Sequence, residues 1–200
     1  MREILVPDYI EGLIFDCDGT LVDSMPLHMR AWEHAVTSRQ GVWQPEFFVA
    51  KKGMAEKRIV TLYNKHYGAS FDPAETVKIK HEFFRAHASE FKPIQQVVDI
   101  VLKYREALPM AVASGGTREI VELELDALHI RGFFQAIVTS DDAIQPKPSP
   151  DIFLEAARQI GIPPQFCQVF EDGDLGLAAA RAAGMLSTDI RVTLTDADKR

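Results

Sequence analysis

The sequence predicts an α/β protein, a parallel sheet covered by helices, with a small helical unit inserted into it. Two observations support this prediction. In the C-terminal half, short apolar runs alternate with segments of helical periodicity, the pattern of a parallel sheet with helices on both faces. A further apolar run lies far upstream, and the stretch that separates it from the others has amphipathic helical patterns but no convincing strand. The 200 residues give room for one ordinary domain with such an insertion.

The first strand is expected at 12–15, a short apolar run that leads directly into acidic residues. The later strands are expected at 110–113, 136–139, 168–170 and 185–190. The helices between them are expected at 118–128, 151–160 and 175–183. Gly161 and Gly184 follow the last two of these helices, where a glycine is typical of a C-terminal stop.

The inserted stretch is expected to form a unit of its own, because its apolar residues recur at helical spacing. We therefore predict a discontinuous core, residues 1–24 with 92–200, and an inserted helical cap, residues 25–91. The hinge between them is expected near Ser24 and Lys92.

Composition excludes several classes of partner. The net charge is −7 and the 22 Lys and Arg residues are scattered, which argues against a nucleic-acid backbone as a partner. No apolar run approaches the ~18 residues of a membrane span, so we expect a cytoplasmic protein without membrane contact. Cys17 and Cys167 lie in apolar, strand-like runs, where small reduced core residues are more typical than a disulfide.

Acidic residues follow two of the expected strands. Asp16 and Asp18 are alternate residues leaving the first strand, and Gly19 lets the chain turn sharply there. Glu171 and Asp172 follow a later strand in the same way. Since open α/β sheets bind ligands at the carboxyl ends of their strands, these four acids are expected in one site. An all-oxygen ligand set of this size suits Mg²⁺, with water and substrate phosphate completing it.

Two further motifs fit an anionic ligand at the same edge. Ser114, Gly115 and Gly116 precede a helix, so a hydroxyl and freed backbone N–H groups are available to a phosphate. Lys147 stands between two prolines, and the constrained backbone on each side suits a lysine whose charge is aimed at one point.

These motifs, in this order, resemble those of the haloacid dehalogenase superfamily of phosphohydrolases, and the resemblance covers the whole chain. The longer runs 15–23, 147–151 and 170–172 are similar to those of the subgroup that contains β-phosphoglucomutase and bacterial fructose-1-phosphate phosphatases. The resemblance implies a Rossmann-like core, a small helical cap after the first motif, and a small phosphorylated metabolite, such as a sugar monophosphate, as substrate.

The resemblance also implies a role for each motif residue. Asp16 would be the nucleophile that carries an aspartyl-phosphate intermediate, and Asp18 would be the general acid and then the base. Ser114, with the neighbouring Gly115, and Lys147 would bind the transferring phosphoryl group. The ligands of Mg²⁺ would be Asp16, the backbone carbonyl of Asp18, Asp172 and Glu171, the last as a ligand or as a partner of the ligands.

In the cap, the resemblance points to His28, Arg58 and Lys80 as candidates for substrate contact. The chain departs from the mutase pattern at Glu56, where the mutase has an arginine that grips a second phosphate. This departure favours a phosphatase.

Three alternatives remain open. A phosphohexomutase would use the same Asp16 and Asp18 but return the phosphoryl group to another hydroxyl of the sugar. A phosphoaccepting receiver domain also has strand-end carboxylates and a lysine, although it lacks D-x-D and a long helical insertion is unexpected in it. A non-catalytic binding relative is the third. For the oligomeric state we expect a monomer or a weak homo-oligomer.

Overall fold

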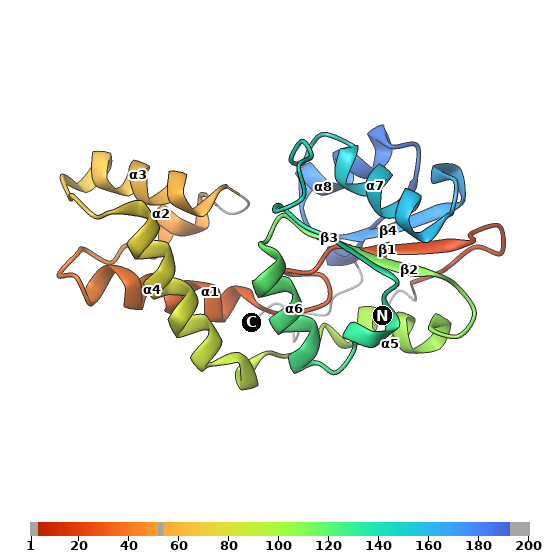
Figure 1. Cartoon of the computed structure of the whole chain (residues 1–200), viewed down its shortest axis with the longest axis horizontal. Helices are drawn as coiled ribbons and strands as arrows, with labels where there is room; N and C mark the ends of the chain where they lie inside the picture. Colours follow the sequence, from red (N-terminus) through yellow and green to blue (C-terminus); the bar gives the residue numbers. More distant parts are fainter. Residues whose placement is uncertain (1–3, 52–53, 193–200) are drawn as a thin grey trace. The chain divides into compact units, whose positions relative to one another are not determined.

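The computed structural model of the chain describes residues 4–51 and 54–192. Its centre is a parallel sheet in the order β3-β2-β1-β4-β5, which confirms the predicted α/β class (Figure 1). The strands are β1 (Gly12–Phe15), β2 (Met110–Ala113), β3 (Ala136–Val138), β4 (Cys167–Glu171) and β5 (Leu186–Asp189). Strand β1 is thus the middle strand although it comes first in the chain, and the acids that follow it lie at the centre of the sheet edge.

Helices cover both faces of the sheet, α7 and α8 on one and α5 and α6 on the other (Figure 1). The helices are α5 (Gln95–Tyr104), α6 (Arg118–Ala127), α7 (Asp151–Ile160) and α8 (Asp174–Ala182). Helix α7 ends at Gly161, whose φ of 74° is left-handed, as the sequence predicts. Under α7 and α8, Phe153 and Ala179 pack into a closed apolar cluster with Ile14 and Val169 of the central strands. Burial of this cluster fixes the strand ends that carry the acidic residues.

The described part of the insertion, residues 24–51 and 54–91, is built of helices and the turns and loops that join them, and it contains no strand. It consists of α1 (Met25–Thr37), α2 (Pro45–Val49), α3 (Glu56–Tyr67) and α4 (Pro73–Ala86). Its core is aromatic, with Trp32, Phe48 and Tyr63 stacked at centroid distances of 5.2 and 5.9 Å. Short 3₁₀ turns span Ala88–Glu90 in the insertion and Arg131–Phe133, Pro164–Phe166 and Ile190–Val192 elsewhere in the chain.

The chain divides into two compact units, unit 1 (residues 1–23 with 92–200) and unit 2 (residues 24–91). Ser24, which the sequence prediction assigns to the core, belongs to unit 2. The chain leaves and re-enters unit 1 through paired backbone: Val22 bridges Pro93 in antiparallel fashion, and the Asp23 N–H donates to the Lys92 carbonyl at 2.9 Å. We call this paired segment the neck.

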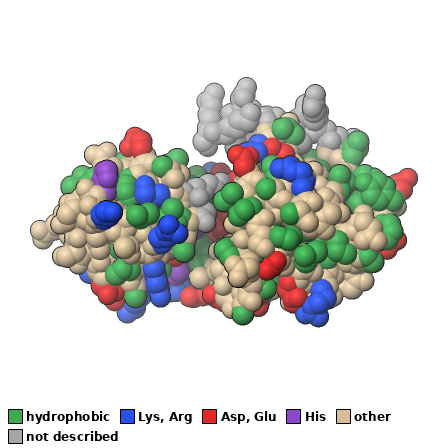
Figure 2. All heavy atoms as spheres, turned by 90° about the horizontal axis from the view of Figure 1, so that it is seen from above, with side chains coloured by type: hydrophobic (Ala, Val, Ile, Leu, Met, Phe, Trp, Pro, Cys, Tyr) green, Lys and Arg blue, Asp and Glu red, His purple; other side chains and the backbone are tan. Residues whose placement is uncertain are grey.

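The described helices and the surface agree with a chain that lacks long apolar segments. Among the described residues, no helix is long and apolar enough to cross a membrane. On the face drawn in Figure 2, basic side chains are interspersed with acidic and apolar ones.

Cys17 and Cys167 are free, buried thiols, and burial raises the pKa of Cys167 to about 11.

Candidate active site

The polar motifs of unit 1 gather at the carboxyl edge of the sheet because β1, β2 and β4 are adjacent and parallel. Asp16 continues directly from β1, and its N–H donates to the carbonyl of Phe170 at 3.0 Å. Ser114 continues directly from β2, and its N–H donates a hydrogen bond to the carbonyl of Val138 at 3.0 Å. The strand pairing therefore extends by one bond into each motif, and the motif side chains start from a rigid backbone.

Lys147 joins two of the predicted acids. Its Nζ donates to Asp16 Oδ1 at 2.7 Å and to Glu171 Oε1 at 2.8 Å, and the lysine side chain is only 13% exposed. Burial lowers the pKa of Lys147, but the charges of Asp16 and Glu171 outweigh burial and raise it well above its usual value. Lys147 is therefore a permanent cation at this site.

Asp16 lies in a strongly anionic surrounding. Burial first, and the charge of Glu171 second, raise the pKa of Asp16 to about 8, although Lys147 opposes this effect. Oxygen atoms of Asp16, Glu171 and Asp172 all lie within 4.8 Å of one another. Three carboxylates so close, with a single ammonium among them, form a donor set that favours an additional cation.

Gly19 brings the loop after β1 against this cluster. Its φ is +80°, and a Cβ at this position would stand 2.5 Å from Asp172 Oδ2. Only glycine meets both demands, the left-handed backbone and the close approach of a carboxylate. The residue that the sequence suggests as a turn element thus also leaves room for the second acidic motif.

Glu171 is held from two sides. Its Oε1 accepts from Lys147, and its Oε2 accepts the N–H of Gly173 at 2.7 Å. Its side chain passes close to α8 at Gly176, where a Cβ would stand 1.7 Å from Oε1. The glycine in the first turn of α8 is therefore what allows Glu171 to reach Lys147.

Ser114 is almost fully buried, at 1% exposure, and its Oγ accepts the N–H of Gly116 at 3.1 Å. Because that bond uses a lone pair, the hydroxyl proton can point elsewhere as a donor. Gly115 is exposed, and nothing lies within 4 Å of a Cβ built there, so its backbone is open to a ligand.

Asp18 is half-buried and has a neighbour that the sequence reasoning missed, Glu124 of α6. A carboxylate oxygen of Asp18 lies within 4.8 Å of one of Glu124, and Glu124 accepts the Cys17 thiol at 3.1 Å. Burial, and then the charge of Glu124, raise the pKa of Cys17 well above its usual value. Glu124 is one of the buried positions of α6, and an acid in an otherwise apolar helical stripe is the signal that could have revealed it.

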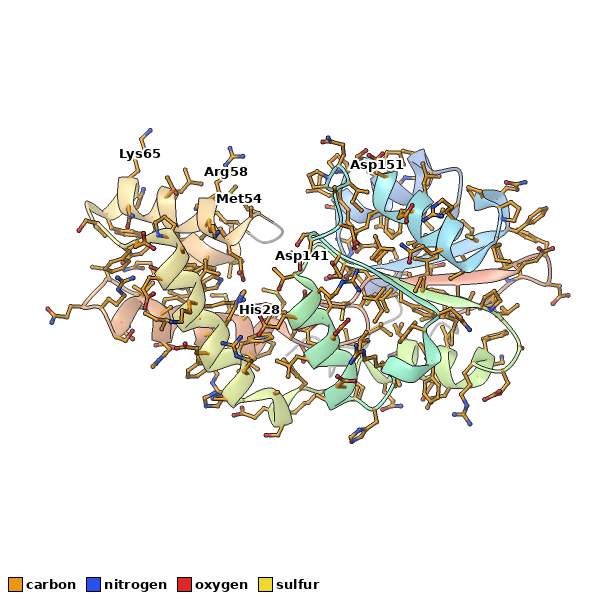
Figure 3. The ribbon with its side chains drawn as sticks, in the orientation of Figure 1. His28, Met54, Arg58, Lys65, Asp141 and Asp151 are labelled. Carbon is orange, nitrogen blue, oxygen red and sulfur yellow. The ribbon has the colours of Figure 1, made fainter. Side chains whose placement is uncertain are left out.

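The cap candidates lie in unit 2. Lys80 is 0% exposed, and its Nζ contacts His28 Nδ1 at 2.8 Å and Glu56 Oε1 at 2.5 Å. Glu56 also binds His81 Nε2 at 2.6 Å. Arg58 is exposed on α3 and points away from the helix (Figure 3). Substrate contact by these residues stays a prediction. Lys80 is buried, and the contacts that the structure shows for its ammonium are to His28 and Glu56.

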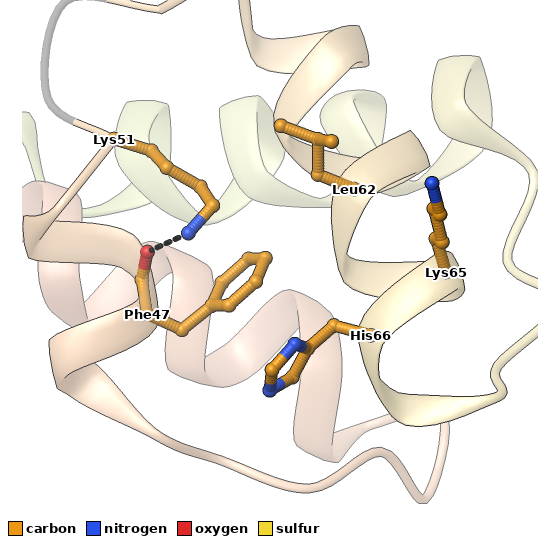
Figure 4. Close-up of a pocket in the computed structure, with 5 residues that line it drawn as sticks. All are labelled: Phe47, Lys51, Leu62, Lys65 and His66. Atoms are coloured by element: carbon orange, nitrogen blue, oxygen red, sulfur yellow. Dashed lines mark hydrogen bonds between the residues drawn. The ribbon is translucent and has the colours of Figure 1, made fainter.

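Unit 2 also has a hollow of about 360 Å³ between α2 and α3 (Figure 4). It is lined by Phe47, Lys51, Leu62, Lys65 and His66, and the Lys51 ammonium is tied to the Phe47 carbonyl at 3.0 Å. None of the predicted site residues lines this hollow.

Comparison with known proteins agrees with the motifs. The model of the haloacid dehalogenase-like hydrolase family matches residues 13–190. The fructose-1-phosphate phosphatase YqaB of Escherichia coli is 36% identical over 181 residues, which are 90% of this chain and 96% of that protein.

Solved structures show the same fold. CbbY from Rhodobacter sphaeroides, in complex with phosphate, superposes with a TM-score of 0.81 at 28% identity, covering 89% of this chain and 84% of that one. A β-phosphoglucomutase from Clostridium difficile has a TM-score of 0.75 at 24% identity, covering 90% and 84%, a likeness that concerns the fold alone. The chain therefore belongs to the haloacid dehalogenase-like hydrolase family and is a phosphatase of that family.

Proposed function

We propose that the chain is a Mg²⁺-dependent phosphatase that hydrolyses small sugar monophosphates through an aspartyl-phosphate intermediate. The observation that carries the proposal is the buried contact of Lys147 with both Asp16 and Glu171, beside Asp172. This arrangement combines a carboxylate at a strand end, a fixed cation for phosphoryl oxygens, and a cluster of oxygen donors.

Mg²⁺ fits the donor set. Asp16, Glu171 and Asp172 offer only carboxylate oxygens, and hard cations of this kind prefer oxygen ligands. In the proposal these three residues and the backbone carbonyl of Asp18 hold the ion. When bound, Mg²⁺ would neutralise charge on the phosphate and on the carboxylates.

Asp16 is the proposed nucleophile. A carboxylate oxygen of Asp16 forms a bond to phosphorus as the bond from phosphorus to the sugar oxygen breaks, and Asp18 gives its proton to that oxygen. A water then attacks phosphorus and gives its proton to Asp18, while the bond from phosphorus to Asp16 breaks. Inorganic phosphate leaves and both carboxyl groups return to their starting states.

Lys147 and Ser114 are the proposed phosphoryl-binding side chains. Lys147 carries a permanent charge, and Ser114 has a hydroxyl proton to donate because its oxygen already accepts from Gly116. Both groups are held by the protein before substrate arrives, so little ordering is needed as charge develops on the phosphoryl oxygens.

The relatives suggest the substrate class. The named activity of the Escherichia coli relative, fructose-1-phosphate phosphatase, supports a phosphorylated ketose or a similar small sugar. Metabolites of this kind also make the cytoplasm the proposed location. Within unit 2, His28, whose Nδ1 lies 2.8 Å from Lys80 Nζ, is the residue that we propose for contact with a sugar hydroxyl.

A phosphate-release screen tests the proposal. Purified protein is assayed against phosphorylated sugars, with fructose 1-phosphate among them, with Mg²⁺ and with EDTA. We expect turnover that requires Mg²⁺ and that is lost in Asp16→Asn. Asp8→Asn, at an exposed position before the amino end of β1, should have normal turnover. Fast conversion of β-glucose 1-phosphate to glucose 6-phosphate, with a trace of glucose bisphosphate, would instead identify a mutase.

A further inference from the structure

Ser140, in the loop after β3, makes an unusual double contact. Its backbone N–H donates to the Gly116 carbonyl at 3.0 Å, and its side-chain Oγ donates to the same oxygen at 2.9 Å. Two donors from one residue converge on one carbonyl of the loop that follows β2. The contact joins two loops that are 24 positions apart in the chain.

The loop that receives this contact contains two adjacent glycines. Gly115 and Gly116 have no side chains, and nothing lies within 4 Å of a Cβ built at Gly115. Paired glycines have wide conformational freedom, so a loop of this composition needs external bonds to keep one geometry. Gly116 also donates to Ser114 Oγ at 3.1 Å, and so the conformation of Gly116 sets the direction of the serine hydroxyl.

The loop that carries Ser140 is itself rigid. Asp142 accepts the Thr139 N–H at 2.8 Å and the Arg118 guanidinium at 3.0 Å. Asp141 accepts the backbone N–H of Arg118, the first residue of α6, at 2.9 Å. Ser140 therefore directly precedes two acids that are tied to Arg118 of α6, and it can act as a fixed support.

We propose that Ser140 is a positioning residue for phosphoryl binding, which acts through Gly116 to hold the hydroxyl of Ser114 in place. This inference rests on the proposed function, in which Ser114 donates to the phosphoryl group. It assigns to the exposed Ser140 a role that no motif in the sequence indicates.

A double-mutant cycle tests the inference. The variants are Ser140→Ala, Ser114→Ala and the double variant, with Ser140→Thr as the conservative change that keeps a hydroxyl. KM, kcat and the inhibition constant of inorganic phosphate are measured for each. Ser140→Ala should raise KM and the inhibition constant about fivefold with a smaller change in kcat, since one hydrogen bond is lost. Ser140→Thr should restore both constants.

The cycle separates positioning from a general structural effect. Once Ser114 is alanine, Ser140→Ala should change the constants less than about twofold, because the group it positions is gone. Ser38→Ala, which removes a side-chain contact of 3.5 Å to the backbone carbonyl of Ala35 in unit 2, should leave the constants unchanged. The inference would be overturned if Ser140→Ala left KM and the inhibition constant unchanged. It would also be overturned if Ser140→Ala raised both constants fivefold whether residue 114 is serine or alanine.

Failure of this inference can be told apart from failure of the proposed function. If the wild type turns over and Ser114→Ala is impaired while Ser140→Ala is normal, only the role of Ser140 is wrong. If the wild type releases no phosphate from any sugar phosphate, the proposed function is wrong. The affinities of the same variants for inorganic phosphate, measured by calorimetry, then still decide the role of Ser140.

Discussion

Lys147 donates a hydrogen bond to Asp16 Oδ1 at 2.7 Å, although 131 positions separate the two residues in the chain. Asp16 comes from the end of the central strand, and Lys147 comes from the loop before α7. The lysine ammonium also lies 5.0 Å from the ring centroid of Phe153, a core residue of α7. The pair is thus anchored on both sides by the packed core of unit 1.

Replacement of Lys147 should damage both activity and stability. In Lys147→Met, Asp16 and Glu171 lose their shared counter-ion, and removal of one partner from a buried ion pair costs about 3 kcal/mol. Turnover should fall about 100-fold or more, because the phosphoryl group loses a fixed cation. Phosphate release in the presence of Mg²⁺ measures the effect on activity, and thermal unfolding in EDTA measures the effect on stability. Lys103→Met, at an exposed position of α5, is the control, and near-normal turnover in Lys147→Met would contradict the proposed site.

Asp172 should determine the need for Mg²⁺. In Asp172→Asn a charged ligand becomes neutral, so the Mg²⁺ concentration for half-maximal activity should rise about 10-fold or more. Activity is titrated with Mg²⁺ after EDTA treatment. The matched control is Asp174→Asn, two residues further on, whose side chain is 85% exposed and paired with Arg191. Equal Mg²⁺ requirements in the two variants would remove Asp172 from the proposed ligand set.

Gly176→Ala should be destabilising, against ordinary helix propensity. Alanine in place of a helical glycine normally stabilises, by up to about 1 kcal/mol in a helix interior. Here the new Cβ would stand 1.7 Å from Glu171 Oε1, so Glu171 must move and lose its bond to Lys147. A lower melting temperature and lower activity are expected from thermal denaturation and phosphate release. Gly132→Ala, with nothing within 4 Å of the added Cβ, should change neither the melting temperature nor the activity. A higher melting temperature in Gly176→Ala would show that Glu171 can move away from the added Cβ at no cost.

Glu56 should give unit 2 a pH-dependent stability. Burial alone would raise the pKa of Glu56, but the hydrogen bond from His81 and the charge of Lys80 prevail and lower it from 4.5 to about 2. Because the pKa of Glu56 is lower in the folded state than in the unfolded state, the ionised carboxylate stabilises the folded state at pH values above 4.5. This stabilisation disappears as the pH falls from about 4.5 towards 2. Glu56→Gln should therefore be less stable than the wild type by about 2 kcal/mol at neutral pH. The difference should shrink below pH 4.5.

The tryptophans make this measurement specific. The chain has two, Trp32 and Trp43, and both lie in unit 2, so their fluorescence during urea unfolding follows this unit. Glu33→Gln, at an exposed position of α1, is the control. A stability difference between Glu56→Gln and the wild type that stays constant down to pH 2 would contradict the ion-pair account.

Much of the fold could be predicted because its signals are local. Strands β1, β2 and β3 are short apolar runs, and Gly161 ends α7 where the sequence indicates a stop. Helix α5 was missed although Val97, Val98 and Val101 have helical spacing, because Ile94 at its N-cap offers no side-chain cap to mark the start. Start signals of this kind are what separate a helix from an apolar stretch in a single sequence.

The site was predictable where a sequence motif marks its residues and hidden where separate loops or helices meet only in the folded chain. The sequence predicted Asp16, Lys147, Glu171 and Asp172, and the structure brings them together. It gave no sign that Ser140 reaches Gly116, since the pairing of two loops depends on strand order. The burial of Lys80 was equally invisible, because its partners Glu56 and His28 come from two other helices.

The neck has a consequence for engineering. Val22 and Pro93 pair in antiparallel fashion, and Asp23 and Lys92 share a backbone hydrogen bond. The insertion therefore begins and ends at neighbouring points of the chain. All 68 intervening residues, 24–91, can then be exchanged for a short turn or for a foreign helical module without rerouting the sheet. Such an exchange would leave the contacts of Lys147 with Asp16 and Glu171 in place, because all three residues lie in unit 1.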